Sequence, residues 1–156
     1  MADFIRQVAY KVWIRDLVNC PYYLGELESS YSLINNKRVS RAHVVATVIQ
    51  KFESENKEYL TVTIDDGSGD IRLKTWKEDI KLISNLEVGD LILVIGKVKK
   101  YNDEVYLVPE IVKKVDPNYE IVHKAELLSL YKDFKTPEKA PEQEVLGIVE
   151  EKIIDE

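Results

Sequence analysis

Three side chains near the middle of the sequence, Arg72, Lys74 and Trp76, place two cations and an aromatic ring at alternate positions. The surrounding residues alternate with a period of two, as in a β-strand, so these three share one face while Ile71 and Leu73 occupy the other. On such a face, cations meet phosphates and an indole ring stacks on a base, which is the chemistry of single-stranded nucleic acid binding. Charged strand faces are also common on ordinary solvated surfaces. The elements that position these residues therefore decide between the two interpretations.

Five segments of the sequence have the composition and alternation of β-strands, and Arg72 lies in the third. They cover residues 41–50, 58–64, 71–76, 91–98 and 104–108, with a short helical candidate starting at Trp76. The second and third segments are joined by Asp65–Asp70, whose two glycines permit a tight turn. This order predicts a mainly β fold, a five-stranded OB-fold Greek-key barrel followed by a C-terminal α-helix. The face of an OB-fold binds oligonucleotides, so this context favours the binding interpretation.

A second basic and aromatic cluster lies at the end of the fourth segment. Lys97, Lys99 and Lys100 lead to Tyr101, which sits in the turn before the fifth segment. A basic hairpin tip with an aromatic ring suits the second wall of a groove for a single strand. The same pattern also fits a solvated turn with Tyr101 packed on a neighbour, and the sequence leaves both interpretations open. We expect Pro109 to end the regular pairing of the fifth strand.

Composition and charge set limits on function. The formal net charge is −6, and residues 137–156 carry −5 of it, so the preceding 136 residues are close to neutral at about −1. A near-neutral domain can present a basic groove, but it would bind a polyanion modestly. The sequence contains one cysteine, Cys20, and no apolar run long enough to span a membrane, which favours a reducing, intracellular compartment. We find no nucleophile–base pair, phosphate loop or metal cluster, so we expect no catalytic residue, cofactor or metal site.

The C-terminal helix is expected to begin cleanly and to carry too many apolar side chains for one buried stripe. Asp116–Pro117 is a typical start, with an N-cap acid and proline in the first turn, and the helical pattern runs to about Phe134. Eight of its residues are expected to contact another subunit: Ile121, Val122, Ala125, Leu127, Leu128, Leu130, Tyr131 and Phe134. The alternative is a helix buried within its own domain. Under the first interpretation the isolated chain would associate with itself through this helix.

These patterns divide the sequence into four parts. We expect an N-terminal strand and extension (1–37), an OB-fold domain (38–116), an oligomerisation helix (117–135), and an acidic linker with a short amphipathic segment (136–156). Within the first part, Val8–Ile14 alternates like a strand, Ile14–Asn19 could form one helical turn, and Pro21–Asn36 is expected to be an irregular connection.

The order of elements and several short motifs resemble the middle subunit of replication protein A, especially its archaeal relatives. The residues that carry the resemblance are Val12–Val18, Val44–Val48, Ile64–Asp70, Lys74–Trp76, Val88–Asp90, Val94–Lys97 and the helix after Pro117. Together they span most of residues 8–131. In that family the middle subunit usually ends in a winged-helix domain, and residues 144–156 look like the opening helix of one. A truncated winged-helix domain is therefore one interpretation of residues 136–156.

The resemblance implies a function and partners. Proteins of this family bind single-stranded DNA in replication, repair and recombination, and they assemble as heterotrimers through a bundle of C-terminal helices. Their binding aromatics match Trp76 and Tyr101 here, and an archaeal member would be cytoplasmic and associated with the nucleoid. Two other functions stay compatible with the sequence: a scaffold subunit with little DNA contact, which the negative net charge favours, and an RNA-binding OB module.

Overall fold

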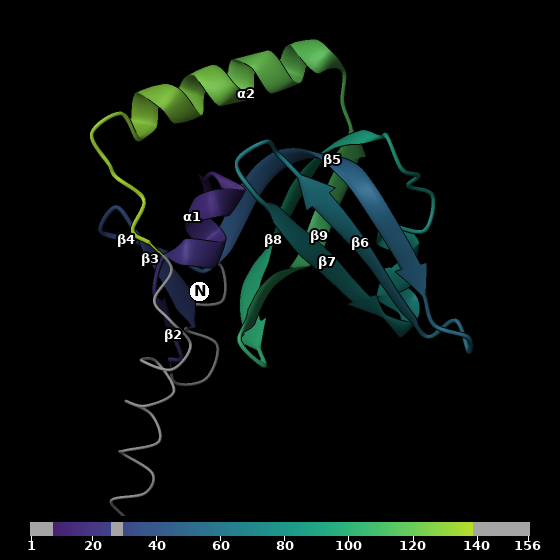
Figure 1. Ribbon diagram of the computed structural model, residues 1–156. Coiled ribbons are helices and arrows are strands. Elements are labelled where there is room, and N and C mark those ends of the chain that lie inside the picture. Colours follow the sequence, from purple (N-terminus) through teal and green to yellow (C-terminus); the bar gives the residue numbers. More distant parts are fainter. Residues whose placement is uncertain (1–7, 26–29, 139–156) are drawn as a thin grey trace, which may run out of the picture.

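A closed five-stranded β-barrel forms the centre of the computed structural model, which describes residues 8–25 and 30–138 (Figure 1). Its strands are β5 (Arg41–Glu53), β6 (Tyr59–Asp65), β7 (Asp70–Trp76), β8 (Leu91–Tyr101) and β9 (Glu104–Lys114). They are ordered β5-β6-β7-β9-β8, and β5 pairs with β8 to close the barrel. The β7–β9 contact is parallel, and the other contacts within the barrel are antiparallel. This arrangement confirms the predicted OB-fold.

One long strand takes part in both sides of the barrel. The first half of β5, Arg41–Thr47, pairs with β8, and its second half, Thr47–Glu53, pairs with β6. The register shifts between Val48 and Gln50, and such a bulge bends a strand strongly. Alternate aliphatic side chains fill the interior, among them Ile64, Ile71, Leu73, Ile92, Val94 and Leu107. Ile71 and Leu73, which the period of two placed on the face opposite Arg72, thus belong to this core.

The expectation that Pro109 ends the fifth strand was wrong. Strand β9 continues through Pro109 to Lys114 and keeps its pairing with β8. Proline has no N–H to donate to the neighbouring strand. The strands tolerate this because their pairing register shifts between Ile95 and Gly96, next to Pro109. A side chain at Gly96 would place its Cβ 2.7 Å from the carbonyl oxygen of Val108, so this close approach requires glycine.

A second, smaller sheet replaces the irregular connection expected over Pro21–Asn36. It consists of β2 (Tyr22–Tyr23), β3 (Tyr31–Ile34) and β4 (Lys37–Val39), all antiparallel. The turn between β3 and β4 is Asn35–Asn36, and both residues have positive φ, at 51° and 66°. Two consecutive positive φ angles make the type I′ turn that suits a tight hairpin, and asparagine tolerates them. That Asn-Asn pair was the signal that sequence reasoning missed.

The N-terminal strand and helix pack between the small sheet and the barrel. Strand β1 (Ala9–Lys11) adds to the barrel in parallel with β5, and α1 (Ile14–Asn19) follows it. Val12, Ile14 and Leu17 are fully buried in the common core. Between β7 and β8 the predicted helical turn is the 3₁₀ helix η2 (Lys77–Leu82), and Ile83 and Leu86 after it are buried.

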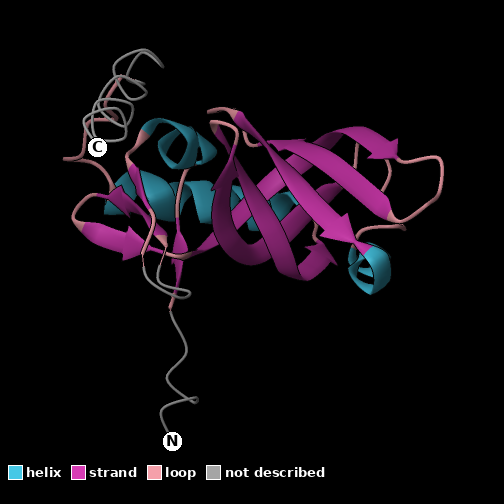
Figure 2. Ribbon diagram, turned by 90° about the horizontal axis from the view of Figure 1, so that it is seen from below, coloured by secondary structure: helices cyan, strands magenta, loops and turns pink. Residues whose placement is uncertain are grey.

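The C-terminal helix α2 (Pro117–Leu130) runs across the barrel and over α1 toward the small sheet; Figures 1 and 2 show this from two sides. The Asp116 side chain accepts hydrogen bonds from the N–H groups of Asn118 and Tyr119, as the predicted N-cap requires. The helix ends at Leu130, four residues earlier than the pattern suggested. Among the described residues, no helix has the length and apolar character needed to cross a membrane.

The packing of α2 revises the list of residues expected at a subunit interface. Leu127 and Tyr131 are 1% and 6% exposed because they pack into the core of their own chain, and Phe134 packs against the same core. The hydroxyl of Tyr131 also donates a hydrogen bond of 2.6 Å to the carbonyl oxygen of Lys11. The helix therefore sits on its own domain through these residues and leaves its other side to solvent.

Candidate nucleic-acid interface

A groove of about 1180 Å³ runs along the outer face of the barrel. Strands β5, β6, β7 and β9 contribute Phe52, Thr61, Thr63, Arg72 and Glu104 to its lining, and the segment after α1 contributes Asn19, Cys20, Pro21 and Tyr22. The hydroxyl of Tyr22 lies 3.5 Å from the carbonyl oxygen of Val98, which holds this segment against β8. An open groove of this kind suits an extended chain.

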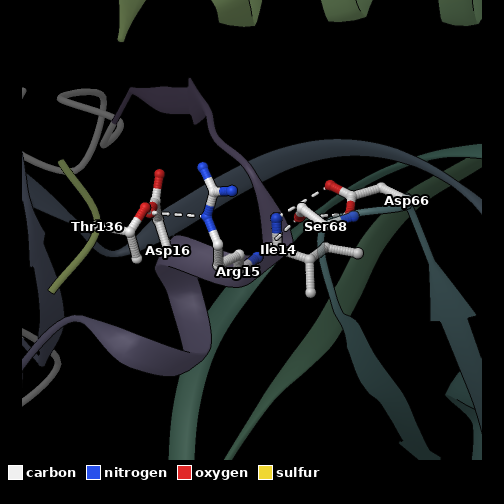
Figure 3. A network of polar contacts seen from close by, with 6 residues as sticks. All are labelled: Ile14, Arg15, Asp16, Asp66, Ser68 and Thr136. Atoms are coloured by element: carbon white, nitrogen blue, oxygen red, sulfur yellow. Dashed lines mark hydrogen bonds and ion pairs between the residues drawn. The ribbon is translucent and has the colours of Figure 1, made fainter. Parts of the chain in front are cut away.

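The turn between β6 and β7 fixes the start of α1 beside the groove (Figure 3). The buried Asp66 carboxylate accepts a 3.0 Å hydrogen bond from the Ile14 N–H and further bonds from the N–H and hydroxyl of Ser68. The Ser68 hydroxyl oxygen in turn accepts from the Arg15 N–H at 3.0 Å. A carboxylate at the first turn of a helix satisfies free N–H groups and complements the helix dipole. The Asp-rich turn thus locks α1 in place.

Arg72 and Lys74 both contact Glu104, which enters the same face from the start of β9. Glu104 accepts hydrogen bonds from Arg72 Nε and Nη2 at 2.6 and 2.8 Å, and from Lys74 Nζ at 2.9 Å. Lys74 also lies 4.3 Å from the centre of the Tyr106 ring, a cation–π contact. Burial raises the pKa of Glu104, but the hydrogen bonds and charges of Lys74 and Arg72 outweigh burial and lower its pKa overall. Arg72 and Lys74, which the sequence predicted to share a face, are therefore adjacent, and both form ion pairs with Glu104.

Trp76 lies at the end of β7, beyond the enclosed part of the groove. The residue is 45% exposed, and its ring rests beside that of Tyr59, with ring centres 5.4 Å apart and planes tilted by 38°. Tyr59 is the direct cross-strand partner of Trp76 on β6. The neighbouring ring limits the motion of Trp76 while leaving one surface open to a stacking partner.

The other predicted contact residues are divided between the groove and other surfaces. Tyr101 is 66% exposed at the tip of the β8–β9 hairpin, whose turn residues Asn102 and Asp103 have positive φ. Its neighbour Lys100 lines the groove, as does Asp103. Lys97 and Lys99 do not line it; they pair in register with Val108 and Tyr106 of β9 on the outside of the barrel. Lys100 is thus a closer candidate for a phosphate contact than the two lysines that precede it.

Sequence reasoning missed two further residues of the groove. Phe52 is 56% exposed on the second half of β5 and lines the groove, whereas the strand predicted from the sequence ended at residue 50. Arg15 enters from α1, and its side chain is 46% exposed. Neither could be found by alternation, because β5 bulges before Phe52 and because α1 reaches the groove only through tertiary packing.

The charges along the groove are mixed. Its cations are Arg15, Arg72 and Lys100, and its acids are Asp65, Asp70, Asp103, Glu104 and Glu138. Such a lining does not attract a polyanion strongly from a distance. Binding here would depend on stacking and on close ion pairs.

Comparison with solved structures finds the same fold in other proteins. The heterotrimer of replication protein A bound to single-stranded DNA contains a chain with 16% identity and a TM-score of 0.67, matching 81% of this chain and 98% of its own. A chain of the Stn1–Ten1 complex from S. pombe has 17% identity and a TM-score of 0.68, with 81% and 93% covered. A chain of yeast replication protein A bound to single-stranded DNA has 18% identity and a TM-score of 0.60 over 81% and 93%. A search of curated protein sequences found no match.

At these identities the structural likeness shows a shared fold. The profile of the OB-fold nucleic acid binding domain matches residues 42–125, which is more than half of the chain and includes every strand of the barrel after Arg41. The chain therefore belongs to the OB-fold nucleic acid binding domain family.

Proposed function

We propose that this chain is a non-catalytic single-stranded-DNA-binding subunit of a complex like replication protein A, with the role of an archaeal middle subunit in replication, repair and recombination. The observation that carries the proposal is the outer face of β7, where Arg72, Lys74 and the half-exposed Trp76 lie in a row beside an open groove. The structural similarity to replication protein A chains supports it. The cytoplasm, in association with the nucleoid, is the corresponding location.

The face can bind DNA by exchanging one anion for another. Glu104 holds Arg72 and Lys74 together, and a phosphate could take the place of its carboxylate on Arg72, whose side chain is 47% exposed. Lys74 is 9% exposed, so a phosphate would reach it only where Glu104 moves away. Trp76 and Phe52 offer exposed rings for stacking at two places along the face. Thr63 of β6, the cross-strand partner of Arg72, adds a hydroxyl to the groove lining. Binding of this kind reads the backbone and the base faces and carries little sequence preference.

The experiment is a comparison of ligands by fluorescence anisotropy. Labelled oligo-dT, an RNA of the same length and a DNA duplex are each titrated with the chain at low salt. We expect oligo-dT to bind tightest, because the groove is open along its length and accommodates unpaired bases. Tighter binding of RNA would instead favour an RNA-binding OB module. Failure to bind any of the three would refute the proposal.

We further propose that α2 joins the chain to other subunits through a helix bundle. Its solvent face carries Ile121, Val122 and Leu128, which are 65%, 60% and 66% exposed, with Ala125 between them. Their spacing places them on one side of the helix, opposite the buried Leu127. Leu130 is 49% exposed and lies outside this stripe, on the side of the helix nearer Leu127. An exposed apolar stripe of this length is unusual on a monomer and suits a partner helix, or a second copy when the chain is isolated.

A second candidate function is a scaffold subunit with marginal DNA contact. The observation that favours it is the acid content of the groove, above all the engagement of Arg72 and Lys74 by Glu104. The scaffold and DNA-binding roles differ in one measurable quantity, the affinity of the isolated chain for single-stranded DNA relative to that of the assembled complex.

A further inference from the structure

A second cavity, of about 520 Å³, lies between the start of α1, the turn between β6 and β7, and the second half of α2. Its lining combines cations with apolar and aromatic side chains: Arg15, Lys124, Lys132, Trp13, Leu128 and Phe134. We call this cavity the Lys124 pocket. It adjoins the groove, because Arg15 and Ser68 line both. A strand that leaves the groove past Arg15 therefore enters the Lys124 pocket.

Lys124 reaches from α2 to the turn between β6 and β7. Its Nζ atom lies 3.6 Å from the position that a Cβ atom would occupy on Gly67. Gly67 has a φ of 93°, which favours glycine, so no side chain stands between the turn and the ammonium group. The ammonium group pairs with Glu120 at 3.2 Å, and the lysine side chain is 36% exposed. An ammonium group has three donors, so Lys124 can bind a second anion while it holds Glu120.

The two acids that line the Lys124 pocket are buried and already accept hydrogen bonds. Asp66 is 4% exposed and accepts from the Ile14 N–H and from the N–H and hydroxyl of Ser68. Asp16 is fully buried and accepts from the hydroxyl of Thr136. Burial raises the pKa of Asp16, although the Thr136 hydrogen bond acts in the opposite direction. Neither acid therefore presents its charge at the opening of the pocket.

The cations of the pocket, in contrast, lie toward solvent. The side chain of Arg15 is 46% exposed, and Figure 3 shows its guanidinium group turned toward the side of the domain on which α2 lies. Lys132 is exposed just beyond the end of α2. The exposed charges of the Lys124 pocket are thus positive, whereas the groove carries more acids than cations. The pocket offers phosphates the counter-charge that the groove lacks.

We propose that the Lys124 pocket is a second subsite for single-stranded DNA, which binds the phosphates of the nucleotides that continue past Arg15. The inference rests on the proposed function of the groove. Lys124 and Lys132 each take one phosphate, and the partly buried rings of Trp13 and Phe134 contact the sugar or the face of an unpaired base. An acidic segment of a partner protein is the other class of ligand for such a cavity. The lining that the pocket shares with the groove favours the DNA strand.

The test compares two lengths of labelled oligo-dT, about 5 and about 15 nucleotides, by fluorescence anisotropy with the full chain. We expect the short strand to occupy the groove, where Phe52 and Trp76 offer exposed rings for stacking. Lys124→Gln with Lys132→Gln should therefore bind the short strand like the parent, because neither lysine lines the groove. The long strand should bind roughly tenfold more weakly at about 50 mM salt.

The salt dependence gives a second readout. For the long strand, the slope of the logarithm of affinity against the logarithm of salt concentration should flatten by about 1.4 in the double variant, about 0.7 for each lost phosphate contact. The matched control is Lys113→Gln with Lys114→Gln, which removes the same charge from the end of β9, outside both cavities. The control should change neither affinity nor slope.

The outcomes separate the inference from the proposed function. Unchanged binding of both strands by the Lys124→Gln, Lys132→Gln protein would overturn the inference while leaving the groove as the DNA-binding face. An equal loss for the short strand, or in the control, would also overturn it, because the effect would then not come from a separate subsite. If the double variant binds DNA like the parent but loses association with a partner subunit, the pocket takes an acidic protein segment instead. If the parent binds neither strand, the proposed function itself fails. Circular dichroism of each protein verifies that the barrel is folded.

Discussion

Glu104 and Arg72 form a two-point ion pair, with Oε2 2.6 Å from Nε and Oε1 2.8 Å from Nη2. This is the geometry in which a guanidinium group also holds a phosphate. Lys74 completes the arrangement at 2.9 Å, so one carboxylate neutralises part of the charge of two cations. Glu104 therefore fixes the positions of Arg72 and Lys74, and it also reduces the positive charge that they present to DNA phosphates.

Replacing this acid should strengthen DNA binding. We expect Glu104→Gln to tighten binding of oligo-dT by about threefold to tenfold, since it removes a negative charge next to the phosphates and releases two cations. Anisotropy titration at low salt measures the change. Glu110→Gln is a matched control that removes the same charge from an ion pair with Arg41 outside the groove lining. Equal gains in the two variants, or a loss in the first, would mean that Glu104 does not compete with DNA.

The salt dependence of binding should report few phosphate contacts. If Arg72, Lys74 and Lys100 each neutralise one phosphate, the logarithm of the affinity should fall with the logarithm of salt concentration with a slope of about −2. Lys100→Gln should flatten the slope by about 0.7, and Lys97→Gln, which lies outside the groove lining, should leave it unchanged. A slope near zero for the parent protein would favour the scaffold role. If Lys97→Gln flattened the slope as much, the DNA path would differ from the groove.

A stacked histidine pair between α2 and the barrel should make the fold sensitive to acid. His43 of β5 and His123 of α2 have ring centres 5.4 Å apart, and His123 is 2% exposed with both nitrogens unpartnered among the described residues. Burial, together with the charges of His43 and Lys11, lowers the pKa of His123 to about 4 even though Glu126 and Asp66 act in the opposite direction. The pKa of His43 is lowered as well, mainly by burial.

The sign of the pH effect follows from these lowered values. Below the ordinary histidine pKa of about 6.5, the unfolded chain takes up protons that the folded chain does not, so the free energy of unfolding should fall between about pH 6.5 and pH 4. The loss from His123 should be on the order of 3 kcal/mol. Urea unfolding across this range measures it, and His123→Phe should remove part of the dependence. If the His123→Phe protein lost stability as steeply between about pH 6.5 and pH 4, the histidine pair would not be the source of the pH dependence.

Association through α2 should depend on its exposed stripe. We expect Ile121→Glu with Leu128→Glu to abolish self-association and partner binding while leaving the barrel folded, because both side chains face solvent in the single chain. Sedimentation of parent and variant measures the effect. Leu127→Glu is the contrasting change: it places a charge in the core of the domain and should destabilise folding itself by several kcal/mol. A parent chain that stays monomeric at high concentration, even with candidate partner subunits, would contradict this role for α2.

The barrel could be predicted from sequence because its signals are local. Alternation in β6 and β7, the glycine-rich turn between them and the Asp116–Pro117 cap each act within a few residues. The small sheet was missed because β2 and β4 are only two and three residues long, too short to show a period. The continuation of β9 through Pro109 was missed because it depends on Gly96 of another strand.

The candidate site was harder to predict because its geometry is tertiary. The period of two placed Arg72, Lys74 and Trp76 on one face, and the structure does bring them together beside a groove. No local pattern could reveal that Glu104 would form ion pairs with both Arg72 and Lys74. Nor could one reveal that Arg15 of α1 would line the groove. Which residues of α2 are buried also depends on tertiary packing. The apolar pattern of the helix therefore could not distinguish the buried Leu127 from the exposed Leu128.

The most direct test of the account is quenching of Trp76 fluorescence by DNA. The measurement uses Trp13→Phe, in which Trp76 is the remaining tryptophan, titrated with oligo-dT at low salt. We expect saturable quenching that salt reverses, and a loss of roughly 1–3 kcal/mol of binding free energy when Trp76→Ala is compared by anisotropy. Unquenched fluorescence throughout the titration, together with unchanged affinity of a folded Trp76→Ala protein, would contradict the claim that this face of β7 binds single-stranded DNA.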